Sequence, residues 1–497
     1  MCPCPIVVPV LRVRGVHCLM ASFRKKEAIV LARERVRSVW VAVVAALGGL
    51  VFGYDSGAMS GALLYLKSAF NLTVFEREAM VSMVIIGAMS GSIITGWLAD
   101  RWGRRRALRW ASIGAGIFAI GTGLAPTYTW FLIARFLVGV TVGMIVVAAP
   151  MYISEFSKTR SRGAASATFQ LAVAVGLTSS YWGDYFFAQS RDWHAMFAVA
   201  VIPALLLWLL LWPLPDTPRW YFLKQRNSDG TKALRFLWQE DSQQISFETA
   251  RITQELDATK SLGTGSYRDL LQPGIRLALL FGIGFSIFQQ FSGINTVTYY
   301  SPTVFAIAGF AKKDAIFITA IIGLITIAAT ILGIALIDRW GRRRLMFFSL
   351  GGMATAMFGL GLAFRLGTRL PGMDILTIGS VVLYHIAFSF GMGLMGWVLL
   401  PEVFPNRIRA RAQSMGRLAN WVANFVVTIS FLSVVKAIGP ADSFWIFVVI
   451  IVLATIFIAR MAPETKNKPL ESIEQYWLNG LRWDSKEPDV VPPLSNP

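Results

Sequence analysis

The sequence predicts an all-α integral membrane protein with twelve transmembrane helices in two pseudo-symmetric six-helix bundles. Three observations favour this class. The chain of 497 residues is 55% hydrophobic and only 15% charged, with a mean hydropathy of +0.56. Its apolar residues form long blocks, of the length that crosses roughly 30 Å of hydrocarbon as a helix. One seven-residue segment also occurs twice. A soluble chain of this length would need more charged surface, so that class is excluded.

The formal net charge of +19 has a regular placement along the chain. Basic residues gather at alternate helix connections, whereas the connections near 124–130 and 186–193 carry few or none. This asymmetry indicates cytoplasmic loops and places both termini in the cytoplasm, in the cell inner membrane. The charge therefore reports topology, and no nucleic-acid partner is expected. The basic residues concerned are Arg101, Arg104, Arg105, Arg106, Arg109, Lys158, Arg160, Arg162, Arg339, Arg342, Arg343, Arg344, Arg407, Arg409 and Arg411.

All three cysteines, Cys2, Cys4 and Cys18, lie in the first twenty residues. We therefore expect no disulfide and no thiolate metal site in the membrane body. No cofactor and no metal are expected, and no set of catalytic residues is present. The prolines near the start make a poor signal peptide, and we expect residues 1–19 to be dispensable.

Apolar blocks between charged or Pro/Gly-rich breaks give two sets of six spans. The first lies near 38–62, 80–99, 108–126, 129–152, 165–187 and 195–214, and the second near 275–304, 315–337, 345–365, 374–401, 412–437 and 441–461. The predicted domains are an N-terminal tail (1–37), an N-terminal bundle (38–215), a cytoplasmic linker with short helices (216–273), a C-terminal bundle (274–463) and a C-terminal tail (464–497). The tail is polar and ends rich in proline, so we expect it to be disordered.

The two sets of spans are related by an internal repeat. Asp100–Arg106, with the sequence DRWGRRR, recurs letter for letter as Asp338–Arg344, between the second and third spans of each half. Glu155 with Arg160 and Arg162 has the same spacing as Glu402 with Arg407 and Arg409. Such repetition predicts two homologous bundles with a substrate site between them near mid-membrane.

Eight short segments in the right order resemble the sugar porter family of the major facilitator superfamily, over about residues 45–475. They are Gly49–Asp55, the two repeated loops, 134–136, 152–155, Pro215–Trp220, Gln289–Tyr300, 401–405 and Pro463–Lys466. The resemblance implies the major facilitator fold and transport of a sugar.

The repeated loops place acids beside arginines at helix ends, which predicts a cytoplasmic gate. Bidentate pairs between arginine and carboxylate across the bundle interface would lock this side while the cavity faces outward, as the family resemblance also implies. The gate residues expected are Asp100, Arg101, Arg104, Glu155, Arg162, Asp338, Arg339, Arg342, Glu402 and Arg409.

We identify two ionisable residues inside the expected spans, Asp55 and Arg135. Charges at membrane depth are costly and are usually paired or functional. Desolvation favours the protonated form of a carboxyl group and a nearby arginine opposes it, so the pair can act as a proton switch. The family resemblance also implies an acid at this position in proton-coupled members. A static ion pair is the alternative, and sodium is disfavoured because only one carboxylate is present.

Polar side chains in the seventh span, at Gln289, Gln290, Asn295 and Tyr299, can share one helix face. Amides donate and accept, which suits the hydroxyl groups of a neutral sugar, whereas an anion would need an unpaired cation and none is evident. The resemblance implies hydroxyl ligands and stacking aromatic rings at a larger set, namely Gln170, Gln289, Gln290, Asn295 and Asn420 with Phe52, Tyr299 and Trp397.

These features predict a proton-coupled importer of a neutral monosaccharide or polyol that works by alternating access. A uniporter and a sensor that binds sugar without moving it are the alternatives. The partners expected are the substrate and membrane lipid, and the chain is expected to be a monomer. The sequence does not distinguish hexose, pentose and cyclitol.

Overall fold

The computed structural model describes residues 14–156, 162–238, 242–261, 272, 275–367, 370–404, 409–466, 468 and 470–483. Within these ranges it describes the side chains from Trp40 onward, except at 42, 162–166, 237–238, 255, 258–261, 409–410 and 470–471. The regular structure of this part of the chain is entirely helical. The expectation that residues 1–19 are dispensable falls on residues 1–13, outside the described part, and on side chains that are not described.

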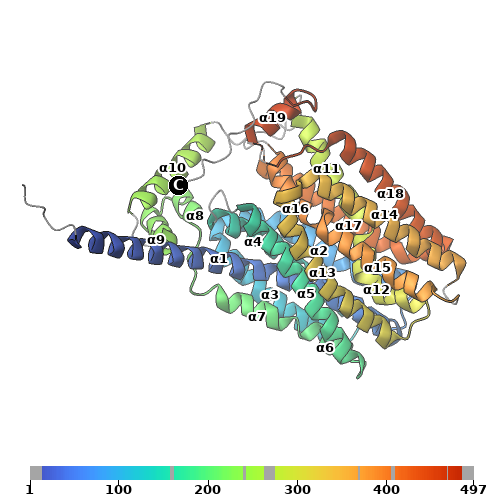
Figure 1. Cartoon of the computed structure of the whole chain (residues 1–497). Coiled ribbons are helices and arrows are strands. Elements are labelled where there is room, and N and C mark those ends of the chain that lie inside the picture. Colours follow the sequence, from blue (N-terminus) through green and yellow to red (C-terminus); the bar gives the residue numbers. More distant parts are fainter. Residues whose placement is uncertain are drawn as a thin grey trace, which may run out of the picture.

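The N-terminal bundle contains seven helical segments. They are α1 (Arg14–Ala69), α2 (Val74–Trp102), α3 (Arg104–Gly123), α4 (Tyr128–Phe156), α5 (Arg162–Ala188), α6 (Trp193–Ala198) and α7 (Val201–Leu210). Helices α8 (Pro218–Leu223), α9 (Asn227–Trp238) and α10 (Ser242–Ser261) follow and pack against one another, and α9 contacts α1 (Figure 1).

The C-terminal bundle repeats this arrangement. Its segments are α11 (Ile275–Phe291), α12 (Ile294–Ile307), α13 (Lys312–Trp340), α14 (Arg342–Leu366), α15 (Met373–Phe390), α16 (Met392–Val403), α17 (Arg409–Ile438) and α18 (Pro440–Met461). Two spans are interrupted by glycine. Gly293, at φ 95°, separates α11 from α12, and Gly391 separates α15 from α16.

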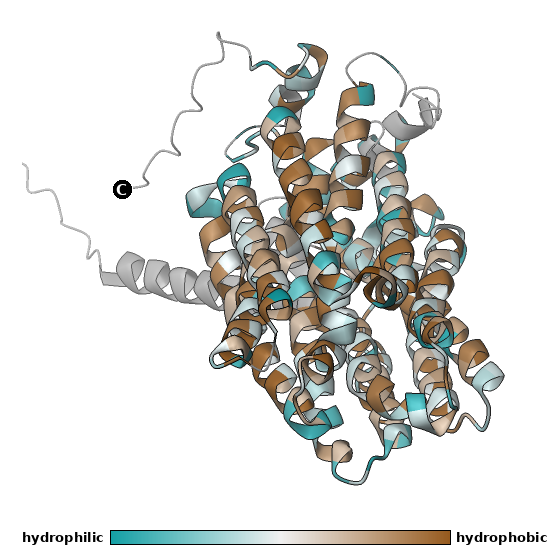
Figure 2. Ribbon diagram, turned by 90° about the vertical axis from the view of Figure 1, so that its right-hand side faces the viewer, coloured by the Kyte–Doolittle hydropathy of each residue, from teal (hydrophilic) through white to brown (hydrophobic). Residues whose placement is uncertain are grey.

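Ten helical stretches of the described chain are long and apolar enough to cross a membrane, with α6–α7, α11–α12 and α15–α16 each counted as one. Helices α3 and α5 complete the twelve. Four arginines lie in the first six residues of α3, which lowers its hydropathy although it packs against α4 and α7. Hydrophobic residues predominate along the middle of the helices (Figure 2), and many large apolar side chains are exposed, such as Ile93, Trp110 and Val449. This is the surface that lipid would cover.

Small residues allow the helices of the N-terminal bundle to approach closely. Gly49, Gly53, Gly57 and Gly61 form a stripe on α1 that faces α5, and a Cβ added at Gly53 would lie 2.1 Å from the carbonyl oxygen of Val173. Gly87 and Gly91 on α2 meet Gly139 and Gly143 on α4 in the same way. Close backbone contact of this kind is the usual basis of helix association in membranes.

The two ends of the bundles differ. We call the end at which α2 and α13 finish, near Trp102 and Trp340, the linker face, because α8–α10 and α19 lie on this side (Figure 1). The other end, at which α1 finishes and α2 begins, near Ala69 and Val74, we call the opposite face.

The expectation of a disordered C-terminal tail is wrong for its first part. Residues Leu470–Leu478 form helix α19, and the Trp477 side chain is buried. Its indole N–H donates to the carbonyl oxygen of Val403 at 3.0 Å. The segment is polar overall, but it is amphipathic, and its apolar side chains lie on one side of the helix. These side chains pack on the linker face and are buried at Ile473, Tyr476 and Trp477.

Candidate functional site

An ion pair lies inside the N-terminal bundle. The Nη1 atom of Arg135 on α4 lies 2.5 Å from Oδ1 of Asp55 on α1, and the side chains are 1% and 8% exposed. The Nε and Nη2 atoms of Arg135 are buried without a hydrogen-bond acceptor among the described residues, and the guanidinium lies over the ring of Phe197. Arg135 thus has one carboxylate partner here, and protonation of Asp55 would remove the charge that balances it.

Four amide side chains from α11, α12 and α17 form one cluster, which we call the amide cluster (Gln289, Gln290, Asn295 and Asn420). Nδ2 of Asn420 donates to Oε1 of Gln289 at 2.9 Å, and Nε2 of Gln290 donates to Oδ1 of Asn420 at 3.0 Å. Asn295 donates to Gln290. Nε2 of Gln289 donates to the carbonyl oxygen of Met392 at the start of α16. Asn295, just after the break between α11 and α12, thus contacts Gln290.

Aromatic residues connect the amide cluster with the N-terminal bundle. Nε1 of Trp397 on α16 donates to Oε1 of Gln170 on α5 at 2.7 Å, and its ring centroid lies 4.7 Å from that of Phe169. Phe52 on α1 contacts Trp421 on α17 edge to face, with centroids 6.1 Å apart. The seam between the bundles therefore carries amides on one wall and aromatic rings at the crossing points.

Tyr299 links the ion pair with this seam. It is 3% exposed and lies close to Ser56, Asn424, Asp55 and Arg135. The structure thus brings Asp55, Arg135 and Tyr299 together, and it separately brings together Gln170 and Trp397. A change in the charge of Asp55 can therefore alter the position or hydrogen bonding of Tyr299, which borders the seam.

The first repeated loop is held inside the N-terminal bundle. Arg104 pairs with Asp100 at 3.0 Å and with Glu155 at 3.1 Å. Asp216, which follows α7, accepts hydrogen bonds from the backbone N–H groups of Arg104 at 2.9 Å and Arg105 at 3.3 Å. Burial raises the pKa of Asp216, and these backbone hydrogen bonds oppose the rise. Gly103 makes the turn at φ 100°.

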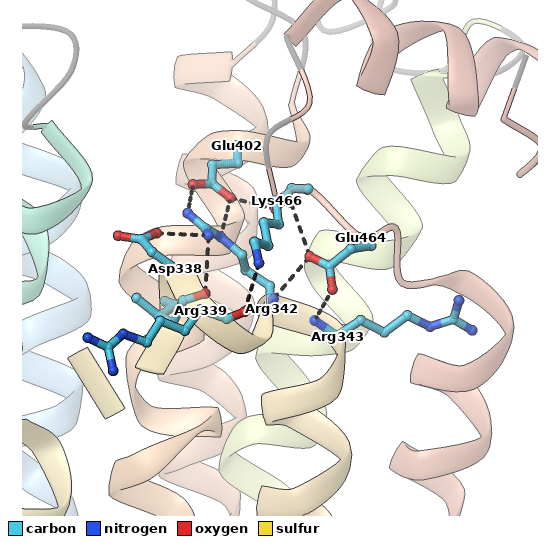
Figure 3. A network of polar contacts seen from close by, with 9 residues as sticks. Asp338, Arg339, Arg342, Arg343, Glu402, Glu464 and Lys466 are labelled. Atoms are coloured by element: carbon cyan, nitrogen blue, oxygen red, sulfur yellow. Dashed lines mark hydrogen bonds and ion pairs between the residues drawn. The ribbon is translucent and has the colours of Figure 1, made fainter. Parts of the chain in front are cut away.

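The second repeated loop has the same plan (Figure 3). Arg342 makes a bidentate contact with Glu402, from Nη2 at 3.0 Å and Nε at 3.2 Å, and also pairs with Asp338 at 3.0 Å. Glu464 accepts from the N–H groups of Arg342 and Arg343 at 3.0 and 3.1 Å. Asp216 and Glu464 therefore occupy equivalent places, each just beyond the last span of its half.

The described pairs do not cross the bundle interface in this structure, and the lock expected for the outward-facing state stays a prediction. Arg104 and Glu155 belong to α3 and α4, and Arg342 and Glu402 belong to α14 and α16, so each described pair stays within one bundle. The reason is local: each arginine is the first residue of a helix, and that helix packs beside the helix that carries the carboxylate. Arg101 and Arg339 lie in the last turns of α2 and α13. The side chains of Arg162 and Arg409 lie outside the described residues, and the locking role remains a prediction.

The bundles are joined on the opposite face. The buried carboxylate of Glu78 on α2 accepts from the N–H and hydroxyl of Ser433 on α17. Lys312 donates to the carbonyl oxygen of Leu64 at 3.0 Å, and Tyr181 donates to that of Thr298 at 3.0 Å. The seam is thus closed at this face.

Three ionisable residues inside the bundles were missed by the sequence reasoning. Glu78 is fully buried, Asp184 on α5 is 1% exposed and accepts from the N–H of Gly61, and Arg417 on α17 stacks on Trp397. Asp184 and Arg417 lie within the expected spans 165–187 and 412–437, so a complete scan of those spans for charge would have found both. In the described part of the chain, no three His, Cys, Asp or Glu residues gather as a metal site.

Comparisons with known proteins agree with this architecture. The family described as "Sugar (and other) transporter" matches residues 41–477. The galactose-proton symporter of Escherichia coli (strain K12) is 32% identical over 453 residues, which cover 90% of this chain and 96% of that protein. The arabinose-proton symporter of Bacillus subtilis (strain 168) is 32% identical over 449 residues, covering 88% and 95%.

Solved structures agree as well. The xylose transporter XylE from E. coli, in its inward open conformation, has a TM-score of 0.74 and 32% identity, covering 88% of this chain and 100% of that one. A structure of the proton:xylose symporter XylE bound to 6-bromo-6-deoxy-D-glucose has a TM-score of 0.76 and 32% identity, covering 89% and 100%.

The fold and the polar seam define a multi-pass membrane transporter of the major facilitator superfamily. Within that superfamily, the chain belongs to the sugar porter family.

Proposed function

We propose that this protein imports a sugar or polyol together with a proton, by alternating access between its two bundles. The observation that carries the proposal is the buried pair of Asp55 and Arg135 beside Tyr299, at the edge of a seam lined by the amide cluster. The paired state has Asp55 ionised. Protonation from one face would release Arg135 and let the bundles rock, because an intramembrane charge without its partner is costly.

The amide cluster and its aromatic neighbours are the proposed substrate site. Four amides offer donors and acceptors on one wall, which matches hydroxyl groups around a sugar ring. Phe52, Tyr299 and Trp397 supply apolar faces that can pack against the carbons of such a ring. The proposal makes the proton the only coupling ion and assigns no catalytic residue, no metal and no cofactor. We also propose that the protein acts as a monomer.

Orientation follows from charge. The arginines of both repeated loops lie at the linker face, so we propose that this face is cytoplasmic, that both termini are cytoplasmic and that the protein resides in the inner membrane. Closure of the opposite face then corresponds to a state that faces the cytoplasm.

Counterflow in proteoliposomes tests the proposal. The purified protein is expected to exchange at least one labelled sugar or polyol from a panel of hexoses, pentoses and cyclitols. In vesicles loaded without substrate, net uptake of the same compound is expected to acidify the lumen. Gln290→Ala is expected to weaken this exchange about tenfold, since it removes hydrogen bonds from the proposed site. Gln475→Ala, an exposed amide on α19, is the matched control.

Three outcomes separate the alternatives. Net downhill uptake without any pH change, and no accumulation driven by an imposed pH gradient, would identify a uniporter. Binding without exchange would identify a sensor. Absence of binding and of exchange across the whole panel would overturn transport of this substrate class.

A further inference from the structure

A cationic side chain faces the same seam as the amide cluster. The Cζ atom of Arg417 on α17 lies 4.3 Å from the centroid of the Trp397 ring. Trp397 in turn donates to Gln170 of the other bundle. Arg417 is therefore stacked on an aromatic residue of the proposed substrate site, at the point where the two bundles meet.

The helical register of α17 shows that Arg417 points inward. Residues 417, 420, 421 and 424 share one helix face, because they are three or four positions apart. On that face Asn420 contacts the glutamines of the amide cluster and Trp421 contacts Phe52. The lipid-facing side of α17 is marked by Leu418 and Val422, which are 44% and 46% exposed. Arg417 is partly exposed, and its register directs that exposure to the seam.

Arg417 differs in its partners from the buried arginines of the described chain. Arg135 is paired with Asp55, Arg104 with Glu155, and Arg342 with Glu402. Among the ion pairs of the described residues none includes Arg417, which stacks on the Trp397 ring. An arginine at membrane depth normally has a counter-charge, because an uncompensated charge there is costly. A site that binds only neutral hydroxyl groups has no need of a positive charge such as that of Arg417.

We propose that Arg417 is an anion subsite and that the substrate is a sugar acid, a polyhydroxy compound with one carboxylate. This rests on the proposed transport through the amide cluster and replaces the neutral substrate expected from the sequence, which assumed no unpaired cation in the cavity. The planar guanidinium matches a carboxylate in a bidentate contact.

The spacing along α17 suits such a molecule. Arg417 lies three residues before Asn420, so the two side chains start about 4.5 Å apart along the helix axis. The hydroxyl groups would contact the amides, and the carboxylate would point toward the linker face, where α17 begins. The ring would then lie against Trp397.

The proposal has a consequence for energetics. A monocarboxylate that enters with one proton on Asp55 carries no net charge across the membrane. Uptake should therefore respond to a pH gradient and not to the membrane potential, whereas a neutral sugar with one proton responds to both.

The test uses the full-length protein in proteoliposomes with two matched pairs, glucose with glucuronate and galactose with galacturonate. The wild type is expected to bind at least one acid about 10- to 100-fold more tightly than its neutral partner, the range typical of a charge-assisted hydrogen bond. Arg417→Gln is expected to reduce this ratio to near one, and Arg417→Lys to keep part of it. Arg460→Gln removes an exposed positive charge from the same bundle and is expected to leave the ratio unchanged.

A wild type that exchanges neutral sugars at least as well as the acids overturns the anion subsite and leaves the proposed sugar transport standing. Failure to exchange either kind overturns both. Should Arg417→Gln fail to fold, the test is the effect of an imposed membrane potential on acid uptake by the wild type. Acid uptake that is unaffected by an imposed potential supports the proposal, and uptake that follows the potential overturns it.

Discussion

Glu78 and Ser433 form a latch between the two bundles at the opposite face. The carboxylate of Glu78 accepts from the backbone N–H of Ser433 at 2.7 Å and from its hydroxyl at 2.5 Å. Glu78 is fully buried, so these hydrogen bonds are made away from water. Hydrogen bonds to a charged group contribute about 1.5–3 kcal/mol, and losing them favours separation of α2 from α17.

Glu78→Gln is expected to open this face more often. We expect a cysteine placed at Thr298, in a variant without Cys2, Cys4 and Cys18, to react several-fold faster with a membrane-impermeant thiol reagent. Glu76→Gln is the matched control, because Glu76 is partly exposed and bonds to Thr73 at the start of its own helix. Equal labelling rates in the two variants would show that Glu78 is not a latch.

Asp55→Asn is expected to abolish accumulation against a gradient and to preserve exchange within a few-fold. Asparagine keeps the shape of the side chain but cannot carry the proton or balance the charge of Arg135. The measurement is proton-driven uptake compared with counterflow, over a range of pH. Asp184→Asn provides the control, since Asp184 accepts from the backbone N–H of Gly61 and asparagine can accept the same bond. Accumulation that survives Asp55→Asn would contradict the coupling role.

Glu402→Gln is expected to lower the free energy of unfolding by about 1–2 kcal/mol, because it loses the charged contact with Arg342 and weakens that with Thr465. Thermal unfolding in detergent measures the effect. Asp338→Asn removes an 81% exposed partner of the same arginine and should change stability by less than about 0.5 kcal/mol. A larger effect at Asp338 than at Glu402 would be inconsistent with the geometry.

Gly53→Ala is expected to lower the free energy of unfolding by about 1–3 kcal/mol, because the added Cβ would overlap the backbone of α5 at Val173. Gly96→Ala is the control, since nothing lies within 4 Å of a Cβ at that position. Alanine there should be neutral or slightly stabilising, given its helix propensity. Unfolding temperatures in detergent compare the two, and a Gly53→Ala protein as stable as the wild type would argue against close packing of α1 on α5.

The sequence predicted the fold class and family correctly, because hydrophobic length and the repeated loop are both local signals. It also named Asp55 with Arg135, and Gln289 with Gln290, Asn295 and Asn420, which the structure brings together in space. Their roles in coupling and binding remain predictions. Helix ends extend beyond the predicted spans, as in α2, because charged residues at the ends were excluded from the apolar blocks.

Other features depend on packing that no local pattern reports. The arginine pairs of the repeated loops were expected to cross between bundles in the outward-facing state. Only the three-dimensional arrangement shows that here α3 lies beside α4 and α14 beside α16, which keeps each pair within one bundle. Arg417 was overlooked because its significance depends on Trp397, which precedes it in the chain on another helix. Glu78 lay just outside an expected span, and its partner Ser433 is 355 residues away.

The placement of Asp216 and Glu464 makes each bundle complete in its own right. Each acid belongs to the residues that follow the final span of its bundle, and each secures the turn into the third span of the same bundle. The chain could be expressed as two polypeptides, the first ending after α9 and the second starting at α10. Each would keep the hydrogen bonds that its own acid makes. Co-expression should then reconstitute a working pair from two chains, with the covalent connection serving to keep the partners in equal number.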